Sequence, residues 1–206
     1  MGSKKFKLAV LVSGQGTNLQ AIIDQIEQGT LAAEIPIVIS NAKEAFALER
    51  AKNHGIKPVF LDPKSYSGKE EFDRALKDLL RAEAVDLVCL SGFMRILGKA
   101  FINSFAGKII NIHPSLLPAF PGLHPQQQAL EHGVKFSGCT VHFVDEGVDS
   151  GPIILQSVVP VYDSDDEEAL SKRILEQEHI IYPRAIQLMV ENRLTVSERK
   201  VTQKKN

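Results

Sequence analysis

The sequence predicts an α/β fold: a doubly wound, mostly parallel sheet with an antiparallel extension in the carboxyl-terminal half. In the first 112 residues, the short apolar runs have no polar residue at every second position. These runs alternate with segments of helical periodicity. This order is typical of a parallel sheet with right-handed crossovers. From residue 113 the pattern changes to a proline-rich loop, two apolar runs joined by turn residues, and a long helix. The two runs predict an antiparallel pair.

The expected elements of the first half are five strands and four helices. Because the strand runs carry no alternating polar residues, we expect both of their faces to be buried. The strands are Leu8–Val12, Ile35–Ile39, Pro58–Leu61, Val85–Leu90 and Ile109–Ile112. The helices are Asn18–Gln28, Glu44–Asn53, Lys69–Ala84 and Arg95–Phe105.

In the second half, the segment from His113 to Pro125 contains four prolines, including Pro125 itself, and predicts an extended loop. We expect a kink at Pro183 and a frayed tail from Glu198. The remaining elements are a helix at Gln126–His132, strands at Cys139–Val144 and Pro152–Val161, and a helix at Glu167–Asn192. No linker or repeat interrupts the chain, so we predict one domain over residues 1–206, with a phosphate-binding half (1–112) and a second half (113–206) that carries the loop, the antiparallel strands and the long helix.

Composition excludes several classes of protein. Twenty-four Lys and Arg against 25 Asp and Glu give a net charge of -1, so no global positive field attracts nucleic acid or anionic lipid. No apolar run approaches the roughly 20 residues of a membrane span. Cys89 and Cys139 both lie in apolar runs, which indicates buried thiols and a cytoplasmic protein. There is no His-Glu-x-x-His and no clustered Cys/His pair, so we predict no metal.

The segment Ser13–Asn18 follows the first strand and opens the first helix. Its glycines allow close backbone approach, and the N–H groups of a helix start favour phosphate. The alternative is a tight turn with Thr17 or Asn18 as the helix N-cap. Either interpretation suits this motif alone.

Polar residues also follow the fourth and fifth strands. Ser91–Leu97 comes after the fourth, and alternation places Asn111 and His113 on the same side of the fifth. An amide and an imidazole can polarise a carbonyl and move a proton, and Asp149 could join them as an anion. Ligands of open α/β sheets bind at the carboxyl ends of strands near the switch point, so we expect one site there. Structural roles for Asn111 and His113, and a turn role for Asp149, stay open, and we expect His142 to be structural.

At these residues the chain resembles the folate-dependent phosphoribosylglycinamide formyltransferase family. The matching segments follow one another in the family's order and extend over nearly the whole chain. The resemblance implies a Rossmann-like formyltransferase fold, and formyl transfer from 10-formyltetrahydrofolate to 5-phosphoribosylglycinamide. The segments that carry it are 13–21, 92–97, 111–118, 120–122, 141–145 and 149–152.

The resemblance also implies roles for single residues on the acceptor side. Gly16, Thr17 and Asn18 match the segment that holds the phosphate and ribose of the acceptor, and Glu178 matches a further acceptor contact. Asn111, His113 and Asp149 match the catalytic trio.

On the folate side, Lys69 falls where the family often has Arg against the glutamate carboxylate; Lys keeps the charge but not bidentate recognition. Pro125 and Gln126 also differ from the commoner residues. The residues that match the folate slot are Met94, Arg95, Ile96, Leu97 and Asn111. The resemblance thus predicts small-molecule substrates, a monomer or homodimer, and no nucleic-acid or membrane partner. The rival interpretations are a 10-formyltetrahydrofolate deformylase and a non-catalytic module that binds phosphoribosyl ligands.

Overall fold

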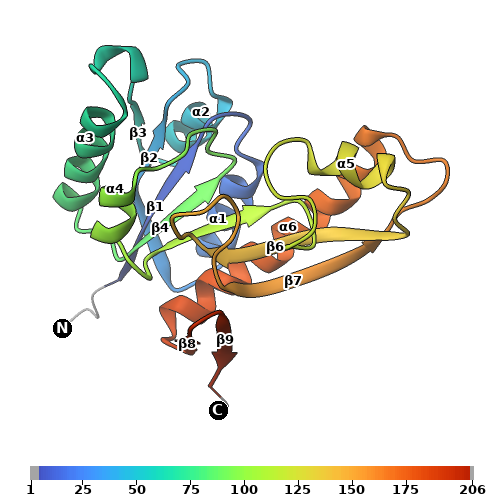
Figure 1. Ribbon diagram of the computed structural model, residues 1–206. Coiled ribbons are helices and arrows are strands. Elements are labelled where there is room, and N and C mark those ends of the chain that lie inside the picture. The colour runs from blue at the N-terminus through green and yellow to red at the C-terminus, as the bar shows by residue number, and fades with distance from the viewer. Residues whose placement is uncertain (1–4, 205–206) are drawn as a thin grey trace. The chain divides into compact units, whose positions relative to one another are not determined.

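A computed structural model describes residues 5–204 of the protein (Figure 1). Two compact units can be distinguished, with the division between Ile110 and Asn111. The main sheet has seven strands in the order β3-β2-β1-β4-β5-β6-β7, and β5 (Ile109–His113) includes the division. This confirms the predicted fold class. The prediction of one domain stays a prediction.

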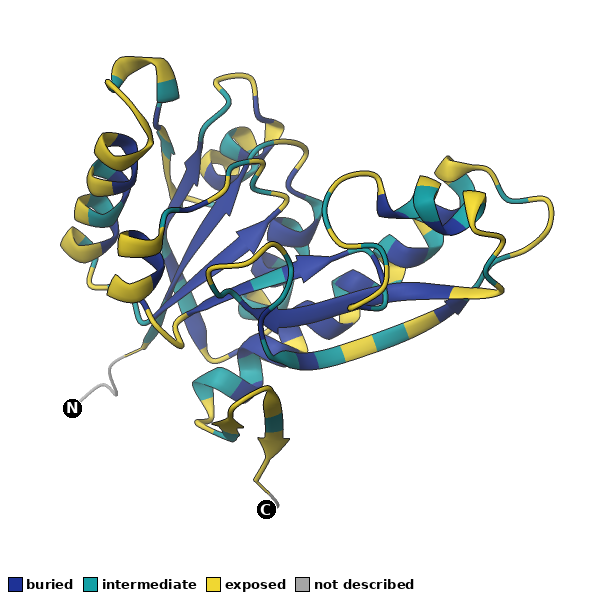
Figure 2. Cartoon of the chain, in the orientation of Figure 1, coloured by how far each residue is buried: buried dark blue, intermediate teal, exposed yellow. Residues whose placement is uncertain are grey.

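The first unit contains the parallel strands β1 (Phe6–Val12), β2 (Ala33–Ser40), β3 (Lys57–Phe60) and β4 (Leu87–Ser91). All four were predicted, and the central strands are buried on both faces, as Figure 2 shows. The expectation of burial is wrong for β3. It is the edge strand, paired only with β2, so Lys57 and Pro58 are exposed and 37% of Phe60 is accessible.

Two pairs of helices cover this part of the sheet. From β1 the chain adds β2 and then β3 toward one edge of the sheet, and it then crosses back to add β4 on the other side of β1. Right-handed crossovers therefore put the first two helices on one face of the sheet and the next two on the other face. The first two pack together, as do the last two. They are α1 (Thr17–Glu27), α2 (Phe46–Asn53), α3 (Lys69–Ala82) and α4 (Lys99–Ser104), with a short 3₁₀ helix at Pro63–Ser65.

The predicted start of the fourth helix at Arg95 is wrong. The helix begins only after Gly98, whose N–H donates to the Asp73 carboxylate at 2.7 Å. This bond ties residue 98 to α3 and keeps residues 95–98 in a loop. Since β1 and β4 are neighbours, the switch point of the sheet lies between the loops that follow them.

The second unit is built on the antiparallel pair β6 (Phe136–Phe143) and β7 (Ile153–Pro160), as predicted. A short helix, α5 (Pro125–Glu131), precedes them, and α6 (Glu167–Val190) packs on both strands. The backbone of α6 stays helical through Pro183, so the predicted kink remains a prediction. Within residues 5–204, no helix has the length and apolar character to cross a membrane.

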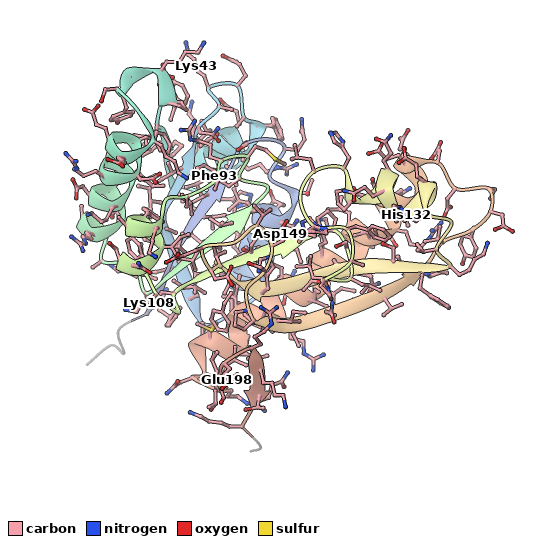
Figure 3. All side chains as sticks on the ribbon, in the orientation of Figure 1. Lys43, Phe93, Lys108, His132, Asp149 and Glu198 are labelled. Carbon is pink, nitrogen blue, oxygen red and sulfur yellow. The ribbon has the colours of Figure 1, made fainter. Side chains whose placement is uncertain are left out.

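The frayed tail predicted from Glu198 is wrong. Residues 194–203 form a hairpin of β8 (Leu194–Ser197) and β9 (Lys200–Gln203), and Figure 3 shows Glu198 at its turn. Glu198 has a φ of 52°, and the Lys204 N–H donates to the Arg193 carbonyl at 2.8 Å. Backbone pairing thus orders a segment whose polar side chains gave no strand pattern.

Candidate functional site

In the first unit, helix α1 begins directly after the glycine-rich loop that follows β1. Gly16 is its N-cap, with a φ of 70°, and supplies no side-chain hydrogen bond. Thr17 or Asn18 as N-cap is therefore wrong. A Cβ on Gly16 would lie 2.6 Å from the Cβ of Ala47. The residue is needed for its left-handed backbone and for contact with α2, and the helix start keeps N–H groups that an anion can use.

The loops after β1 and β4 meet, as the switch-point argument predicts. The Met94 N–H donates to the Ser13 hydroxyl at 2.7 Å, and this hydroxyl donates to the Asn41 side chain after β2. Ser13 therefore joins the carboxyl ends of three neighbouring strands.

Of the residues matched to the folate slot, the four consecutive ones from Met94 to Leu97 differ in exposure. Met94 and Ile96 are 68% and 69% exposed, while Leu97 is buried in the core. Arg95 is half-buried, and its guanidinium lies 4.4 Å from the centre of the Phe72 ring. Met94 and Ile96 therefore offer apolar surface to a ligand, whereas Leu97 and Arg95 anchor the loop.

Lys69 is exposed at the first turn of α3. It lies near Asp73, a buried carboxyl whose pKa is raised by burial, against the lowering effects of the Gly98 hydrogen bond and of the Lys69 and Arg95 charges. Asp73 thus fixes the loop before α4 through Gly98, and Lys69 remains accessible to an anionic ligand.

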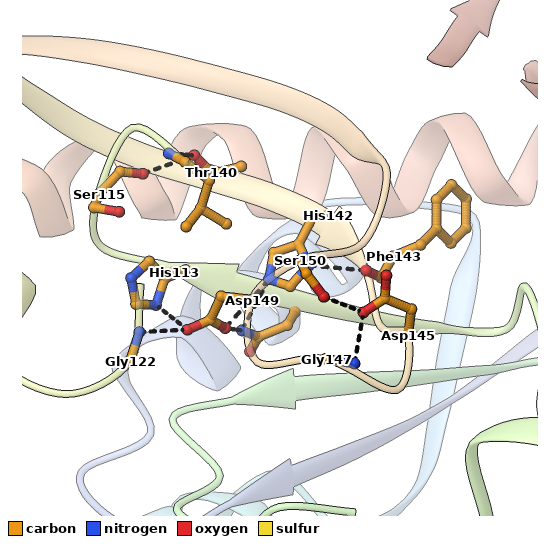
Figure 4. Close-up of polar contacts among 12 residues, drawn as sticks. His113, Ser115, Gly122, Thr140, His142, Phe143, Asp145, Gly147, Asp149 and Ser150 are labelled. Atoms are coloured by element: carbon orange, nitrogen blue, oxygen red, sulfur yellow. Dashed lines mark hydrogen bonds and ion pairs between the residues drawn. The ribbon is translucent and has the colours of Figure 1, made fainter. Parts of the chain in front are cut away.

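In the second unit, the three predicted catalytic residues lie together, and Figure 4 shows His113 and Asp149 facing each other. The Asn111 amide donates to Oδ1 of Asp149 at 3.4 Å, and Nδ1 of His113 lies 3.3 Å from Oδ2 of the same carboxylate. Asn111 and His113 therefore point to the same side of β5, as alternation predicts. Asp149 belongs to the loop between β6 and β7, and the Gly122 N–H also donates to it at 2.9 Å.

His113 has an acceptor at each ring nitrogen. Nε2 lies 2.9 Å from the Phe120 carbonyl, which can only accept, so this nitrogen carries a proton. Burial lowers the pKa of His113, and nearby His142 lowers it further; the Phe120 carbonyl and the Asp149 charge oppose this shift without cancelling it. The imidazolium is thus stabilised by Asp149 but costly in its buried site.

Asp149 has a turn conformation and also supplies the carboxylate of this cluster. Its φ is 49°, and its carboxylate lies near four polar groups: the Asn111 amide, the Gly122 N–H and the rings of His113 and His142. Burial raises the pKa of this carboxyl, but the neighbouring His142 side chain, the hydrogen bond from the Gly122 N–H and the nearby His113 ring bring it below its ordinary value. Asp149 is therefore an anion near neutral pH.

His142 is a neighbour of this cluster that sequence reasoning missed. It is buried on β6, with Nε2 at 3.2 Å from the Asn111 amide nitrogen and 3.6 Å from Oδ1 of Asp149. Its Nδ1 lies 2.8 Å from the Phe143 carbonyl and therefore donates, which leaves Nε2 of the neutral ring as an acceptor for Asn111. The available signal was a histidine on the strand next to β5.

Glu178 is buried on α6. Burial raises the pKa of the Cys139 thiol on β6 to about 12, and the charge of Glu178 adds to this shift. Its contact with an acceptor stays a prediction. Within the part of the chain that the structure describes, no three or more His, Cys, Asp or Glu side chains lie together in a way that could hold a metal ion.

Several known proteins are similar to this chain over most of its length. Residues 6–186 match the family model described as formyl transferase. Phosphoribosylglycinamide formyltransferase of Escherichia coli is 45% identical over 191 residues, which are 93% of this chain and 90% of that protein. The crystal structure of glycinamide ribonucleotide transformylase 1 from Symbiobacterium toebii has a TM-score of 0.97 and 50% identity, covering 99% of this chain and 96% of that one.

Two other matches are to longer proteins. The trifunctional purine biosynthetic protein adenosine-3 of Drosophila melanogaster is 46% identical over 199 residues, and the chain spans only 15% of its length. A formyltetrahydrofolate deformylase from Pseudomonas syringae has a TM-score of 0.91 at 30% identity, and the match covers 98% of this chain but 67% of that one.

Proposed function

Because the chain belongs to the formyl transferase family, we propose that it transfers the formyl group of 10-formyltetrahydrofolate to the amine of 5-phosphoribosylglycinamide, in purine biosynthesis. The observation that carries this proposal is the contact of Asn111, His113 and Asp149 in a chain that matches 90% of the Escherichia coli formyltransferase at 45% identity. Both substrates are small molecules.

The reaction is an acyl transfer. The acceptor amine forms a bond to the formyl carbon, and the carbonyl oxygen becomes the oxyanion of a tetrahedral intermediate. As this collapses, the bond to the folate nitrogen breaks. The amine loses one proton and the leaving nitrogen gains one. The enzyme needs to stabilise the oxyanion, move the proton and hold the two substrates together.

Asn111 is suited to the oxyanion, since its amide nitrogen is a donor and the residue is half-buried, whereas His113 and His142 are buried. Its hydrogen bond to Asp149 is long, at 3.4 Å, whereas that to His142 is 3.2 Å. We infer that the formyl oxygen replaces Asp149 as acceptor. The Asp149 carboxylate can then accept the proton that the amine loses.

His113 stabilises the same negative charge as an imidazolium. Because Nε2 already donates to the Phe120 carbonyl and Nδ1 faces Asp149, proton transfer to the leaving nitrogen requires one of these two bonds to be exchanged for the substrate. Until it accepts the proton that the amine loses, the Asp149 carboxylate favours the charged ring.

The binding roles remain as the family pattern suggests. Gly16, Thr17 and Asn18 bind the phosphate and ribose, with Glu178 as a further acceptor contact. Met94 and Ile96 supply the exposed apolar surface for the pteridine, supported by Arg95 and Leu97, and Lys69 meets the glutamate tail. The protein acts in the cytoplasm as a monomer or homodimer, without a nucleic-acid or membrane partner.

The experiment that tests this function follows an isotopically labelled formyl carbon. The protein is incubated with labelled 10-formyltetrahydrofolate and 5-phosphoribosylglycinamide, and the products are identified by NMR. We expect the label in the formamide of the acceptor. Label only in free formate would instead support the deformylase, and unchanged folate would support a binding module without catalysis.

A further inference from the structure

A half-buried arginine on α2 is bonded to the loop that opens α1. Nε of Arg50 donates to the Gln15 carbonyl at 2.9 Å, and Nη1 donates to the side-chain oxygen of Gln20 at 3.0 Å. Its Cδ lies 3.6 Å from the position that a Cβ on Gly16 would occupy. Arg50 thus contacts the phosphate-binding segment on the side that faces α2.

The bond to the Gln15 carbonyl fixes the direction of a neighbouring donor. In a trans peptide, the carbonyl of one residue and the N–H of the next point in opposite directions. With the Gln15 carbonyl directed to Arg50, the Gly16 N–H points away from α2. The preceding peptide is held likewise, because the Ala47 N–H donates to the Gly14 carbonyl at 3.1 Å.

Arg50 is itself held in a single orientation. Its guanidinium lies 4.9 Å from the centre of the Phe46 ring. The Gln20 amide nitrogen donates to Asp24 at 2.8 Å and lies 3.1 Å from Nε2 of His54, so the amide oxygen of Gln20 is left to face Arg50. Arg50, Phe46 and Gln20 therefore form a cluster that supports the loop from the side of α2, and we call this cluster the brace.

We propose that Arg50 is a positioning residue for the acceptor's phosphate: it holds the Gln15–Gly16 peptide so that the Gly16 N–H faces the anion. The inference rests on the proposed function, because it assigns the phosphate to this helix start. A glycine-rich loop can rotate its peptides freely, and loss of the brace would let the Gly16 N–H turn away. The positive charge of Arg50 adds attraction for a phosphate.

The test compares two acceptors, 5-phosphoribosylglycinamide and the glycinamide riboside that lacks the phosphate. Arg50→Met keeps the aliphatic stem and removes both donors. We expect kcat/KM for the phosphorylated acceptor to fall about tenfold or more, mainly through KM, as is typical for hydrogen bonds from a charged group. The kcat/KM for the riboside and the KM for the folate should stay within about twofold. An equal loss for both acceptors would overturn the proposal.

The matched control is Lys52→Met, which removes the same charge from an exposed position on the same helix and should leave both acceptors unchanged. Arg50→Lys keeps the charge but cannot reproduce both hydrogen bonds, so most of the loss should persist. If Arg50→Lys behaves like the parent, charge alone explains the effect and the positioning role is wrong.

Two further measurements keep the result decisive. If Arg50→Met fails to fold, Gln20→Met removes the acceptor at Nη1 and should raise the KM for the phosphorylated acceptor about two- to threefold, whereas an unchanged KM contradicts the proposal. If the parent protein transfers no formyl group, the proposed function is wrong, and calorimetry with ribose 5-phosphate tests Arg50 alone. Weaker binding to Arg50→Met than to Lys52→Met supports the brace, and equal binding overturns it.

Discussion

The Asp149 carboxylate lies 3.3 Å from Nδ1 of His113 and opposes the effect of burial on that histidine. Burial lowers the pKa of His113, while the Phe120 carbonyl and the negative charge of Asp149 raise it, and the balance is a pKa below the ordinary value. The population of imidazolium therefore depends on Asp149, and this dependence has a definite sign. Removal of the charge lowers the histidine pKa further.

Asp149→Asn keeps the side-chain shape and removes the charge. We expect turnover near neutral pH to fall by at least about tenfold, because fewer molecules carry the imidazolium. For the same reason the alkaline limb of the kcat–pH profile should move to lower pH. The KM values should change little, since the loss falls on the transition state. Steady-state kinetics between acidic and alkaline pH measure all three quantities.

Asp163→Asn is a control for this variant, because Asp163 is an exposed carboxylate paired with Lys135. It should reproduce the parent profile. A folded Asp149→Asn protein with turnover within about threefold of the parent and the same alkaline limb would limit Asp149 to its turn.

Asn111→Ala removes the donor that we assign to the oxyanion. The expected loss is about 10²–10³ in kcat, the range seen when one such donor is deleted. Binding of both substrates should be nearly retained. A loss confined to KM, with kcat unchanged, would show that Asn111 acts in ground-state binding and not in the transition state.

Gly16→Ala tests the backbone reason for this glycine. The new Cβ would lie 2.6 Å from the Cβ of Ala47, at a φ of 70°, so we expect a loss of about 1–3 kcal/mol in the free energy of unfolding. The control is Gly14→Ala, because a Cβ there meets nothing within 4 Å among the described residues. Urea unfolding compares the two. Equal stabilities would contradict the close packing of α1 against α2.

Lys69→Ala tests the contact with the glutamate tail. Lys69 is exposed, so we expect a screened interaction: the KM for the folate should rise about two- to fivefold with kcat nearly intact. Lys77→Ala, on the same helix, should change neither constant. A large fall in kcat with an unchanged folate KM would remove Lys69 from the folate site.

The two cysteines should be inert in the folded protein. Both are fully buried, and burial together with Glu178 raises the pKa of Cys139 to about 12, so almost no thiolate exists near neutral pH. A thiol reagent in water should label neither cysteine until urea unfolds the chain. Rapid labelling of the native protein at Cys139 would contradict the burial of this face of β6.

The sequence predicted what local pattern determines. Continuous apolar runs located the parallel strands, and alternation along β5 placed Asn111 and His113 on one side. The convergence of the loops after β1 and β4 followed from strand order, and the Ser13–Met94 hydrogen bond confirms it.

What the sequence could not predict depends on contacts between distant residues. The exposure of β3 follows from its position at the sheet edge, and the late start of α4 follows from the Asp73–Gly98 bond. In the sequence, His142 has no feature that separates it from other polar residues on strands. Its contact with Asn111 depends on the pairing of β6 with β5. The β8–β9 hairpin is ordered by backbone pairing. It has too few apolar side chains to give a strand pattern that could be recognised in the sequence.

We expect the protein to pass the formyl group to an amine and not to water. The most direct measurement is the steady-state rate of tetrahydrofolate formation from 10-formyltetrahydrofolate, with and without 5-phosphoribosylglycinamide, while free formate is measured in the same samples. We predict folate turnover only when the acceptor is present, with one formylated acceptor for each tetrahydrofolate and no rise in formate. Formate release at the same rate without the acceptor would contradict the account and identify a hydrolase.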